Sequence, residues 1–507
     1  MSDKRRIAKN TVFLYLRMIL VMGITIYTSR VVLEKLGIDN FGIYQTVGGV
    51  VGMVSFINGI LSTGTSRFIT FALGQNNESI LRRTFSTTMT VQFAFIAVII
   101  ALAETVGLWF VKNKLEIPLE SYNAAVWAYH IAILSTALGM LNIPFNATII
   151  AHERMNFFAY TSIFTVSAQL GICYLLSFSP INKLVFYSLL IFAVTVIGLI
   201  INVIYCYKQF PESHYEPIFD KKIFKEIAGF SGWSIFAATS IALNTQGILI
   251  LLNMFFSPAV VAARAISLQV NNAASQFVSN FRMAANPQII KEYAAGQYDE
   301  SKELLLSSTK FSFYLMFLIS LPVCVGAYDL LHVWLKEVPP YSVIFLQIVI
   351  VQSLFQVFDT SFYTALYAKG DLKLNALISP TLGFIQFPII YILFRNGASP
   401  VALSWAGLIV YAVLGLLIKP ILLIKIVKYS WKDILEVIVP CMRVGLIASI
   451  VACTIISFIH IKDKDLLNLI IKTCICVAIS IPTIYLFGLT SQMREKVSSI
   501  FARKFHL

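Results

Sequence analysis

Apolar segments long enough to cross a membrane recur along this sequence and constrain its fold more than any other feature. A helix needs about 20 apolar residues to span the hydrocarbon core of a bilayer. Fourteen such segments are found, at approximately residues 11–33, 41–62, 84–111, 124–150, 157–178, 184–207, 229–253, 258–281, 311–335, 341–367, 374–394, 401–424, 440–460 and 469–489. Since a helix satisfies its own backbone hydrogen bonds in lipid, the pattern predicts an all-α polytopic membrane protein.

Composition excludes several other classes of protein. With 58% hydrophobic and 13% charged residues among 507, the chain is too apolar for a soluble globular protein. The seven cysteines lie almost wholly within apolar segments and lack metal-ligand spacing, so we expect no metal site. There is no glycine-rich phosphate loop and no catalytic motif, so we expect neither a cofactor nor an enzymatic activity.

The distribution of basic residues predicts the topology. If the N-terminus is cytoplasmic, 25 of the 39 Lys and Arg lie in cytoplasmic segments and eight lie on the opposite side. Cytoplasmic loops of membrane proteins carry such an excess, so both termini are expected in the cytoplasm. The net charge of +14 is scattered over many short loops rather than gathered in one patch, which argues against nucleic-acid binding.

A repeat at an offset of 222 residues divides the chain. Eight of thirty ungapped positions are identical between residues 58–87 and 280–309, including Gly74 with Gly296 and Gln75 with Gln297. Six predicted spans separate the copies, so both insert the same way up, as parallel repeats do. We therefore expect an N-terminal six-helix bundle (residues 1–207), a cytoplasmic linker (208–228), a C-terminal six-helix bundle (229–424), and two additional helices with a cytoplasmic tail (425–507).

Residues 262–301 form the one membrane-length segment that carries polar groups most of the way round. At helical spacing, one stripe consists of Arg264, Ser267, Asn271 and Ser275, and the nearly opposite stripe consists of Gln269, Asn272, Gln276 and Asn280. An unpaired amide or guanidinium costs several kcal/mol or more in hydrocarbon. These groups are therefore expected to face other helices or a water-filled cavity.

Three arginines lie within predicted spans. Arg17 lies near the cytoplasmic end of the first helix and Arg30 near its outer end, while Arg264 lies in the outer part of the eighth. Two guanidinium groups that face one cavity would suit a phosphate or diphosphate, whose oxygens accept paired hydrogen bonds. The alternative is that Arg30 and Arg264 form structural ion pairs with Glu104 or Asp329.

Asp359 lies inside the tenth predicted span, on a helical stripe with Gln352 and Gln356, so it is expected to face protein or water rather than lipid. It is a candidate for coupling transport to a proton or cation, and the alternative is a hydrogen-bonded carboxylate between helices. Glu104 raises the same question.

Three more cations lie close to the ends of predicted spans. They are Lys419, Arg443 and Lys472. Long basic side chains in such positions extend their charged groups to the membrane surface, so we expect all three to snorkel rather than to act in transport.

Several short motifs follow one another in a characteristic order. In and after the first predicted span these are Asn10, Arg17, Tyr27, Arg30, Leu36, Gly37, Asp39, Phe41, Gly42 and Tyr44. Further along are residues 151–154, the stretch from Asn280 to Gln297, Pro322, Trp334, Leu335 and Pro339, and residues 368–375. This order resembles the polysaccharide-repeat-unit (O-antigen or lipid-linked oligosaccharide) flippases of the multidrug/oligosaccharidyl-lipid/polysaccharide exporter superfamily, over most of the chain up to about residue 425.

The resemblance implies a MATE-like fold in which two six-helix bundles surround a cavity that opens alternately to each side. It implies that a polyprenyl-diphosphate-linked oligosaccharide moves from the cytoplasmic to the outer leaflet of the bacterial inner membrane, for O-antigen and lipopolysaccharide synthesis. A polysaccharide polymerase and a chain-length regulator are then possible partners. Arg17, Arg30 and Arg264 would serve as cationic cavity residues. Sugar hydrogen bonds would come from five amides: Gln269, Asn272, Gln276, Gln352 and Gln356.

Two other functions remain open. A multidrug or cation exporter of the same fold would need an anionic or aromatic cavity, whereas the embedded residues here are mostly basic. A membrane polysaccharide polymerase or ligase would place its chemistry on a large outer loop. The longest predicted outer connection, residues 112–123, has only about a dozen residues.

Overall fold

Every element in the part of the chain that the structure describes is helical. The structure is a computed structural model, and it describes residues 3–54, 65, 69, 72–73, 78–152, 154–218, 220–221, 224, 239–371, 373–458, 465–490 and 494. Among these residues there is no β-strand. Side chains of the first helix are described from Met18 onward.

Ten helical segments within the described ranges are long and apolar enough to cross a membrane. They are Glu78–Lys114, Leu119–Ala151, Met155–Phe178, Lys183–Gln209, Tyr298–Val325, Ser342–Lys369, Lys373–Arg395, Ala402–Val427, Trp431–Ser457 and Asp465–Gly488. Each coincides with a span predicted from the sequence. The described parts of the other four predicted spans are helical as well. The prediction of an all-α polytopic membrane protein is therefore confirmed.

The helices are grouped into two compact units. Unit 1 comprises Met1–Ala265 with Gly383–Pro400, and unit 2 comprises Ile266–Leu382 with Val401–Leu507. Two long helices, α11 (Pro258–Ala294) and α15 (Lys373–Arg395), contribute to both units. The domain boundaries expected from the sequence remain a prediction.

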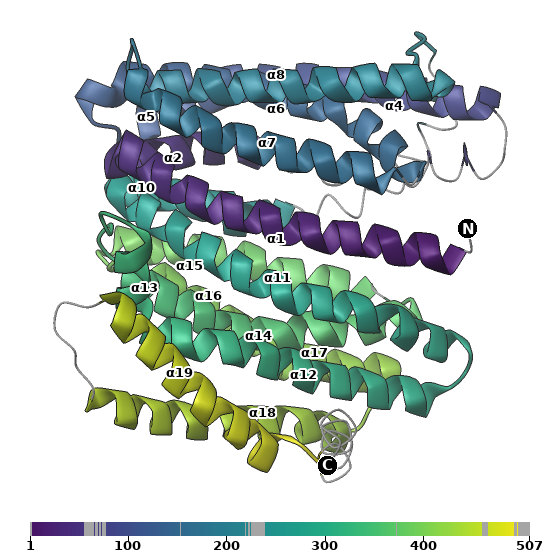
Figure 1. Ribbon diagram of the computed structural model, residues 1–507, viewed down its shortest axis with the longest axis vertical. Coiled ribbons are helices and arrows are strands. Elements are labelled where there is room, and N and C mark those ends of the chain that lie inside the picture. Colours follow the sequence, from purple (N-terminus) through teal and green to yellow (C-terminus); the bar gives the residue numbers. More distant parts are fainter. Residues whose placement is uncertain are drawn as a thin grey trace. The chain divides into compact units, whose positions relative to one another are not determined.

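Unit 1 contains the helices that precede α11. They are α1 (Asp3–Leu36), α2 (Ile38–Val54), α4 (Glu78–Leu102), α5 (Leu108–Lys114), α6 (Tyr122–Ala151), α7 (Met155–Leu175), α8 (Lys183–Gln209) and α10 (Ile248–Phe255). Short 3-10 turns are η2 (Leu119–Ser121), η3 (Leu176–Phe178) and η4 (Pro211–Ser213), and π-helical turns are η1 (Ala103–Gly107) and η5 (Leu243–Gly247). Helix α6 packs along α8, and α1 packs along α7 (Figure 1).

Close packing between α2 and the start of α11 depends on a glycine. A Cβ atom placed on Gly42 would lie 1.9 Å from the carbonyl oxygen of Pro258, so a side chain at this position would force the two backbones apart. Nearby, Asn253 of α10 is fully buried and forms two hydrogen bonds with the backbone of Glu116. These contacts fasten α10 and α11 to the part of unit 1 formed by α2 and the α5–η2 connection.

Unit 2 contains the rest of α11 and the helices that follow. They are α12 (Tyr298–Val325), α13 (Ala327–Trp334), α14 (Ser342–Lys369), the start of α15, α16 (Ala402–Val413), α17 (Lys419–Leu422), α18 (Trp431–Ser457) and α19 (Asp465–Thr483). Three π-helical turns interrupt this unit: η6 (Leu414–Ile418), η7 (Leu423–Val427) and η8 (Ile484–Gly488). Helix α14 packs against α12 and α16 (Figure 1).

The core of unit 2 is a continuous apolar cluster that includes α18 and α19. Phe313 stacks on Phe358 of α14, with ring centroids 5.2 Å apart. The next residue of α12, Tyr314, donates a hydrogen bond from its hydroxyl to the carbonyl of Gly488 at 2.9 Å. The last two helices are therefore packed into the same core as α12 and α14 rather than held by the connecting loop alone.

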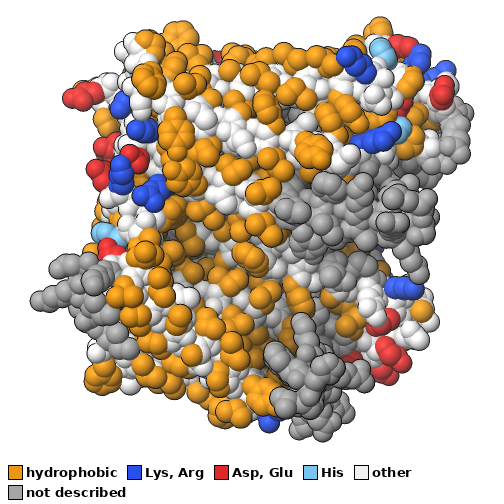
Figure 2. Space-filling view, viewed as in Figure 1, with side chains coloured by type: hydrophobic (Ala, Val, Ile, Leu, Met, Phe, Trp, Pro, Cys, Tyr) orange, Lys and Arg blue, Asp and Glu red, His pale blue; other side chains and the backbone are white. Residues whose placement is uncertain are grey.

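The surface agrees with a membrane setting. On the face in Figure 2, hydrophobic side chains cover the middle of the helices, while Lys, Arg, Asp and Glu gather toward the helix ends. Large apolar side chains such as Val106, Trp127 and Ile450 are more than 60% exposed. In water such exposure would be unfavourable, whereas lipid tails solvate these groups.

Candidate functional site

The two polar stripes predicted on α11 have different surroundings. Arg264, Ser267 and Asn271, from the first stripe, are buried. Within unit 2, the Ser267 hydroxyl donates to the backbone carbonyl of Ser342, and the Ser353 hydroxyl donates to Oδ1 of Asn271 at 2.5 Å. The first stripe therefore holds α11 to α14, because its polar groups are paired between the two helices.

The second stripe is more open. Asn272 and Gln276 are exposed, and Gln269 and Asn280 are partly buried. Exposed amides at this position in a membrane helix need water or a polar ligand as partners. Phe277 and Phe281 are also exposed and lie one turn apart on the same helix. The open side of α11 thus combines a stripe of amides with a stripe of aromatic rings.

The two glutamines predicted on α14 are buried or partly buried. Gln352 is 8% exposed, and its Oε1 has no hydrogen-bond partner among the described residues. Gln356, one turn further along, is partly buried. Both lie in unit 2, as do Gln269, Asn272 and Gln276.

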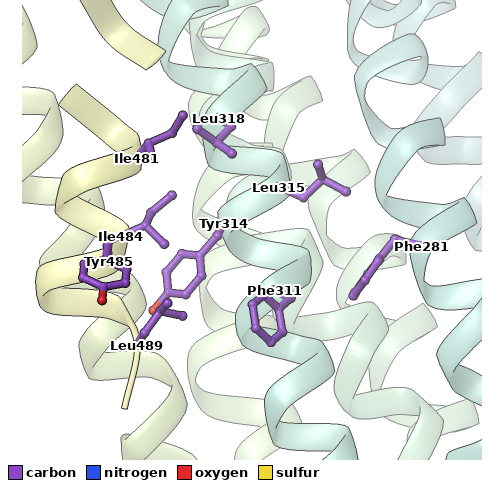
Figure 3. A pocket seen from close by; sticks show the side chains of 9 residues that line it. All are labelled: Phe281, Phe311, Tyr314, Leu315, Leu318, Ile481, Ile484, Tyr485 and Leu489. Atoms are coloured by element: carbon purple, nitrogen blue, oxygen red, sulfur yellow. The ribbon is translucent and has the colours of Figure 1, made fainter. Parts of the chain in front are cut away.

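An apolar groove begins at Phe281 and runs between α12 and the end of α19. Its lining residues are Phe281, Phe311, Tyr314, Leu315, Leu318, Ile481, Ile484, Tyr485 and Leu489, and its volume is about 370 Å³ (Figure 3). The phenol oxygens are almost the only polar atoms in this lining, so the groove suits a hydrocarbon chain. Sequence reasoning missed it, because its residues come from segments about 200 positions apart.

The predicted arginines belong to unit 1 or lie at its edge. Arg17 lies in α1, but its side chain is outside the described part of the structure. Arg30 is partly buried, and Arg264 is 5% exposed. Arg30 and Arg264 thus belong to unit 1, and the five amides belong to unit 2.

Glu104 and Asp329, the carboxylates that could have formed ion pairs with Arg30 and Arg264, each contact a different basic side chain. Glu104, in η1, lies 2.9 Å from Nδ1 of His130 on α6. Asp329, in α13, lies 2.5 Å from Nζ of Lys472 on α19, and both side chains are largely buried. Snorkelling is therefore wrong for Lys472, whose charge is used between helices.

Asp359 pairs with a lysine that was expected to snorkel. Its Oδ1 lies 3.1 Å from Nζ of Lys419, and the Lys419 side chain is only 3% exposed. The ammonium also donates a hydrogen bond to Oδ1 of Asn375 and lies 5.4 Å from the ring centre of Tyr363. Snorkelling is thus wrong for Lys419 as well, and Asp359 is paired with a lysine from another helix.

Local structure explains why Lys419 points inward. It begins the four-residue helix α17, between the π-helical turns η6 and η7. Each π-turn inserts an extra residue and shifts the helical register, which changes the face on which later side chains lie. The one sequence signal for the pair is that Lys419 and Asp359 lie at similar distances from the predicted cytoplasmic ends of their spans.

Arg443, in α18, is exposed.

Comparison with known proteins identifies the fold. No protein-family model and no curated protein sequence matches this chain. An inward-facing multidrug resistance MATE family transporter of the MOP superfamily superposes with a TM-score of 0.68 at 13% identity, covering 83% of this chain and 99% of that one. MATE multidrug transporter DinF-BH, in complex with R6G, gives a TM-score of 0.61 at 14% identity, covering 84% of this chain and 96% of that one.

Lipid II flippase MurJ, in an inward closed conformation, gives a TM-score of 0.65 at 11% identity. This match covers 99% of the present chain and 100% of MurJ, so it extends over nearly all the described helices, whereas the MATE matches leave part of the chain uncovered. The chain therefore has the fold that MATE transporters share with the flippase MurJ.

Proposed function

We propose that this protein moves polyprenyl-diphosphate-linked oligosaccharide repeat units from the cytoplasmic to the outer leaflet by alternating access. The observation that carries the proposal is the open side of α11, where exposed amides lie beside aromatic residues that lead into an apolar groove. An amphiphilic substrate needs both surfaces within reach of one molecule, and here one helix presents both.

The sugar headgroup is assigned to the amide stripe. Asn272 and Gln276 are exposed, and each amide offers two N–H donors and a carbonyl acceptor. Sugar hydroxyl groups can satisfy both kinds of group. Gln269, Gln352 and Gln356, which also belong to unit 2, are proposed to supply further hydrogen bonds, while Arg17, Arg30 and Arg264 are proposed to attract the anionic part of the substrate.

The polyprenyl tail is assigned to the groove of Figure 3. Moving a hydrocarbon chain from lipid into an apolar groove has little hydrophobic driving force, because lipid tails are as apolar as the groove. The groove therefore contributes through van der Waals packing and keeps the tail beside α11 while the headgroup crosses. The groove is open rather than enclosed, which suits a chain that remains partly in the bilayer.

The fold supports the same conclusion. One structure of similar fold is a flippase for a lipid-linked molecule, lipid II, and its match covers nearly the whole of this chain. Multidrug transporters share the fold as well, so an exporter of drugs or cations is the alternative. Two carboxylates that a cationic drug could use, Asp359 and Asp329, are each paired with a lysine, which disfavours that alternative. A polysaccharide polymerase with its chain-length regulator would take up the delivered repeat units.

The test is to delete the gene in its native host and locate the lipid-linked oligosaccharide with an impermeant lectin. We expect the single repeat unit to accumulate on the cytoplasmic face, and expression of the wild-type protein to restore surface polysaccharide. Repeat units that reach the outer face without polymerising would overturn the proposal. Unchanged polysaccharide together with lost drug efflux would favour the exporter.

A matched pair of variants then tests the amide stripe. The double variant Asn272→Leu, Gln276→Leu removes the exposed hydrogen-bonding groups of α11 while keeping side chains of similar size. The control is Thr454→Leu, which replaces an exposed polar residue of α18 in the same unit. We expect the double variant to lose translocation and the control to retain it, at equal protein levels.

A further inference from the structure

We infer that Arg282, Asp359 and Lys419 form a diphosphate subsite in unit 2, in which the Asp359 carboxylate occupies the place of a substrate phosphate until the substrate displaces it. The three residues come from α11, α14 and α17 and all belong to unit 2. The identity of the ligand rests on the proposed function, whereas the site itself rests on the contacts below.

The Asp359–Lys419 contact is ionic but poorly aligned. Oδ1 of Asp359 lies 3.1 Å from Nζ of Lys419, yet it has no hydrogen-bond partner among the described residues. The hydrogen bond from Lys419 goes to Asn375 instead. A carboxylate held by charge without aligned hydrogen bonds is more readily exchanged for another anion than one held by both.

Arg282 supplies a second cation near Asp359. Along α11 it lies between Asn271 and Asn286, whose side chains hydrogen-bond to Ser353 and Thr364 of α14, on either side of Asp359. No ion pair joins Arg282 to Asp359 within the described residues. Its Nε is buried and has no hydrogen-bond partner in the same part of the chain. A buried guanidinium nitrogen without an acceptor is unfavourable, so Arg282 is suited to receive an additional anionic oxygen.

The charges of the triad do not balance. Two cations lie near one carboxylate, which leaves one positive charge in excess within the triad. A structural ion pair would not require Arg282, whose buried Nε has no acceptor among the described residues. A diphosphate carries more negative charge than a single carboxylate and has several acceptor oxygens. It can therefore contact both cations at once, which Asp359 does not.

The exposure of the side chains indicates the order in which an entering ligand meets Asp359 and Lys419. The side chain of Asp359 is 17% exposed, and Tyr363 on the next turn is more open still, whereas Lys419 is almost fully buried. An entering ligand therefore meets the carboxylate first and must take its place. The flexible four-carbon stem of lysine lets the ammonium follow the new anion, while Asn375 remains as its resting partner. No covalent bond changes in this exchange.

The test measures ligand binding by the purified full-length protein in lipid nanodiscs. The probe is farnesyl diphosphate, with farnesol as the control that lacks the diphosphate and inorganic pyrophosphate as the control that lacks the lipid. We expect Lys419→Met and Arg282→Gln to weaken farnesyl diphosphate binding by about tenfold each, because each removes a charge-assisted contact. Asp359→Asn removes the competing anion and should tighten binding by a similar factor.

Opposite signs for Asp359→Asn and Lys419→Met are the decisive result, because two partners in a purely structural pair would change binding in the same direction. If Lys419→Met alone does not fold, the comparison is made in protein that also carries Asp359→Asn, where loss of Lys419 should again weaken binding about tenfold. Arg443→Gln, at an exposed arginine, is the matched control and should bind as wild type does.

The subsite would be overturned if the wild-type protein bound farnesol as tightly as farnesyl diphosphate. It would also be overturned if Asp359→Asn and Lys419→Met changed the affinity for farnesyl diphosphate in the same direction. If pyrophosphate bound as tightly as farnesyl diphosphate, the site would bind a free anion, and its assignment to a lipid headgroup would be wrong. If wild-type protein translocates oligosaccharide while the three substitutions leave diphosphate binding unchanged, the subsite fails and the proposed function stands. If the binding results follow expectation but translocation is absent, the proposed function fails instead.

Discussion

Nζ of Lys472 lies 2.5 Å from Oδ2 of Asp329, and this ion pair joins α19 to α13 at a largely buried position. Removal of one partner leaves a buried charge uncompensated. We therefore expect Lys472→Met to lower the free energy of unfolding by about 3–5 kcal/mol. Thermal unfolding of the detergent-solubilised protein measures this loss.

The control for this pair removes both charges together. Lys472→Met combined with Asp329→Leu should recover most of the lost stability, since apolar groups can replace a buried ion pair at little cost. Arg443→Met, at an exposed position in α18, should change stability by less than about 0.5 kcal/mol. A double variant as unstable as the single one would show that packing, rather than charge, is responsible.

Two glycines of α2 form a matched test of close packing. Gly42→Ala places a Cβ atom 1.9 Å from the carbonyl oxygen of Pro258, so we expect a loss of about 1–3 kcal/mol or more. Gly48→Ala has no atom within 4 Å and should be neutral or stabilising by about 0.5–1 kcal/mol, because alanine favours helix. The measurement is the unfolding temperature of each variant. Equal temperatures for Gly42→Ala and Gly48→Ala would contradict the close approach of α2 and α11.

The connection after α8 carries a pH-dependent contact. Glu212 accepts a hydrogen bond from Nε2 of His152 at 2.5 Å, and the His152 ring stacks on Phe210. Burial raises the pKa of Glu212, but the hydrogen bonds from His152 and the backbone and the charges of His152 and Arg82 outweigh it. The pKa therefore lies below its ordinary value of 4.5.

A lowered carboxyl pKa stabilises the folded state above the unfolded pKa, and this stabilisation is lost as the pH falls through the folded value. We expect Glu212→Gln to be less stable than wild type at pH 7 by about 1.5–3 kcal/mol, and the difference to shrink below about pH 4. Glu216→Gln is the control, because its ion pair with Arg82 is more than 40% exposed on both sides and is worth less than about 1 kcal/mol. A difference that does not depend on pH would contradict the role of the carboxylate.

The groove beside α12 offers a test of the tail assignment. Leu315→Trp or Ile484→Trp fills part of its volume of about 370 Å³ and should slow translocation by about tenfold, because the indole occupies space that the tail would use and removes about 1.4 kcal/mol of its packing. Ile450→Trp, on the exposed face of α18, adds the same bulk outside the groove and should leave the rate unchanged. Fluorescent lipid-linked oligosaccharide in proteoliposomes provides the measurement, and normal rates in both groove variants would remove the groove from the substrate path.

Much of the candidate site followed from local pattern. The two stripes of α11 were predicted from helical spacing alone, and they divide into a stripe with buried members such as Asn271 and a more open one with Asn272 and Gln276. The stripe that holds Asp359 away from lipid was predicted in the same way. Its partner was not, because Lys419 is 60 residues distant and its inward direction depends on two π-helical turns.

The sequence by itself predicted where the described membrane segments lie and in what order, because hydrophobicity and helical periodicity are properties of neighbouring residues. Only the tertiary structure decided which charges are paired and where the groove lies. Asp359 pairs with Lys419 and Asp329 pairs with Lys472, while Phe281 and Ile484 line one groove, through the packing of helices that are far apart in the chain. At one depth in a bundle several helices can supply a partner, and side-chain packing selects among them.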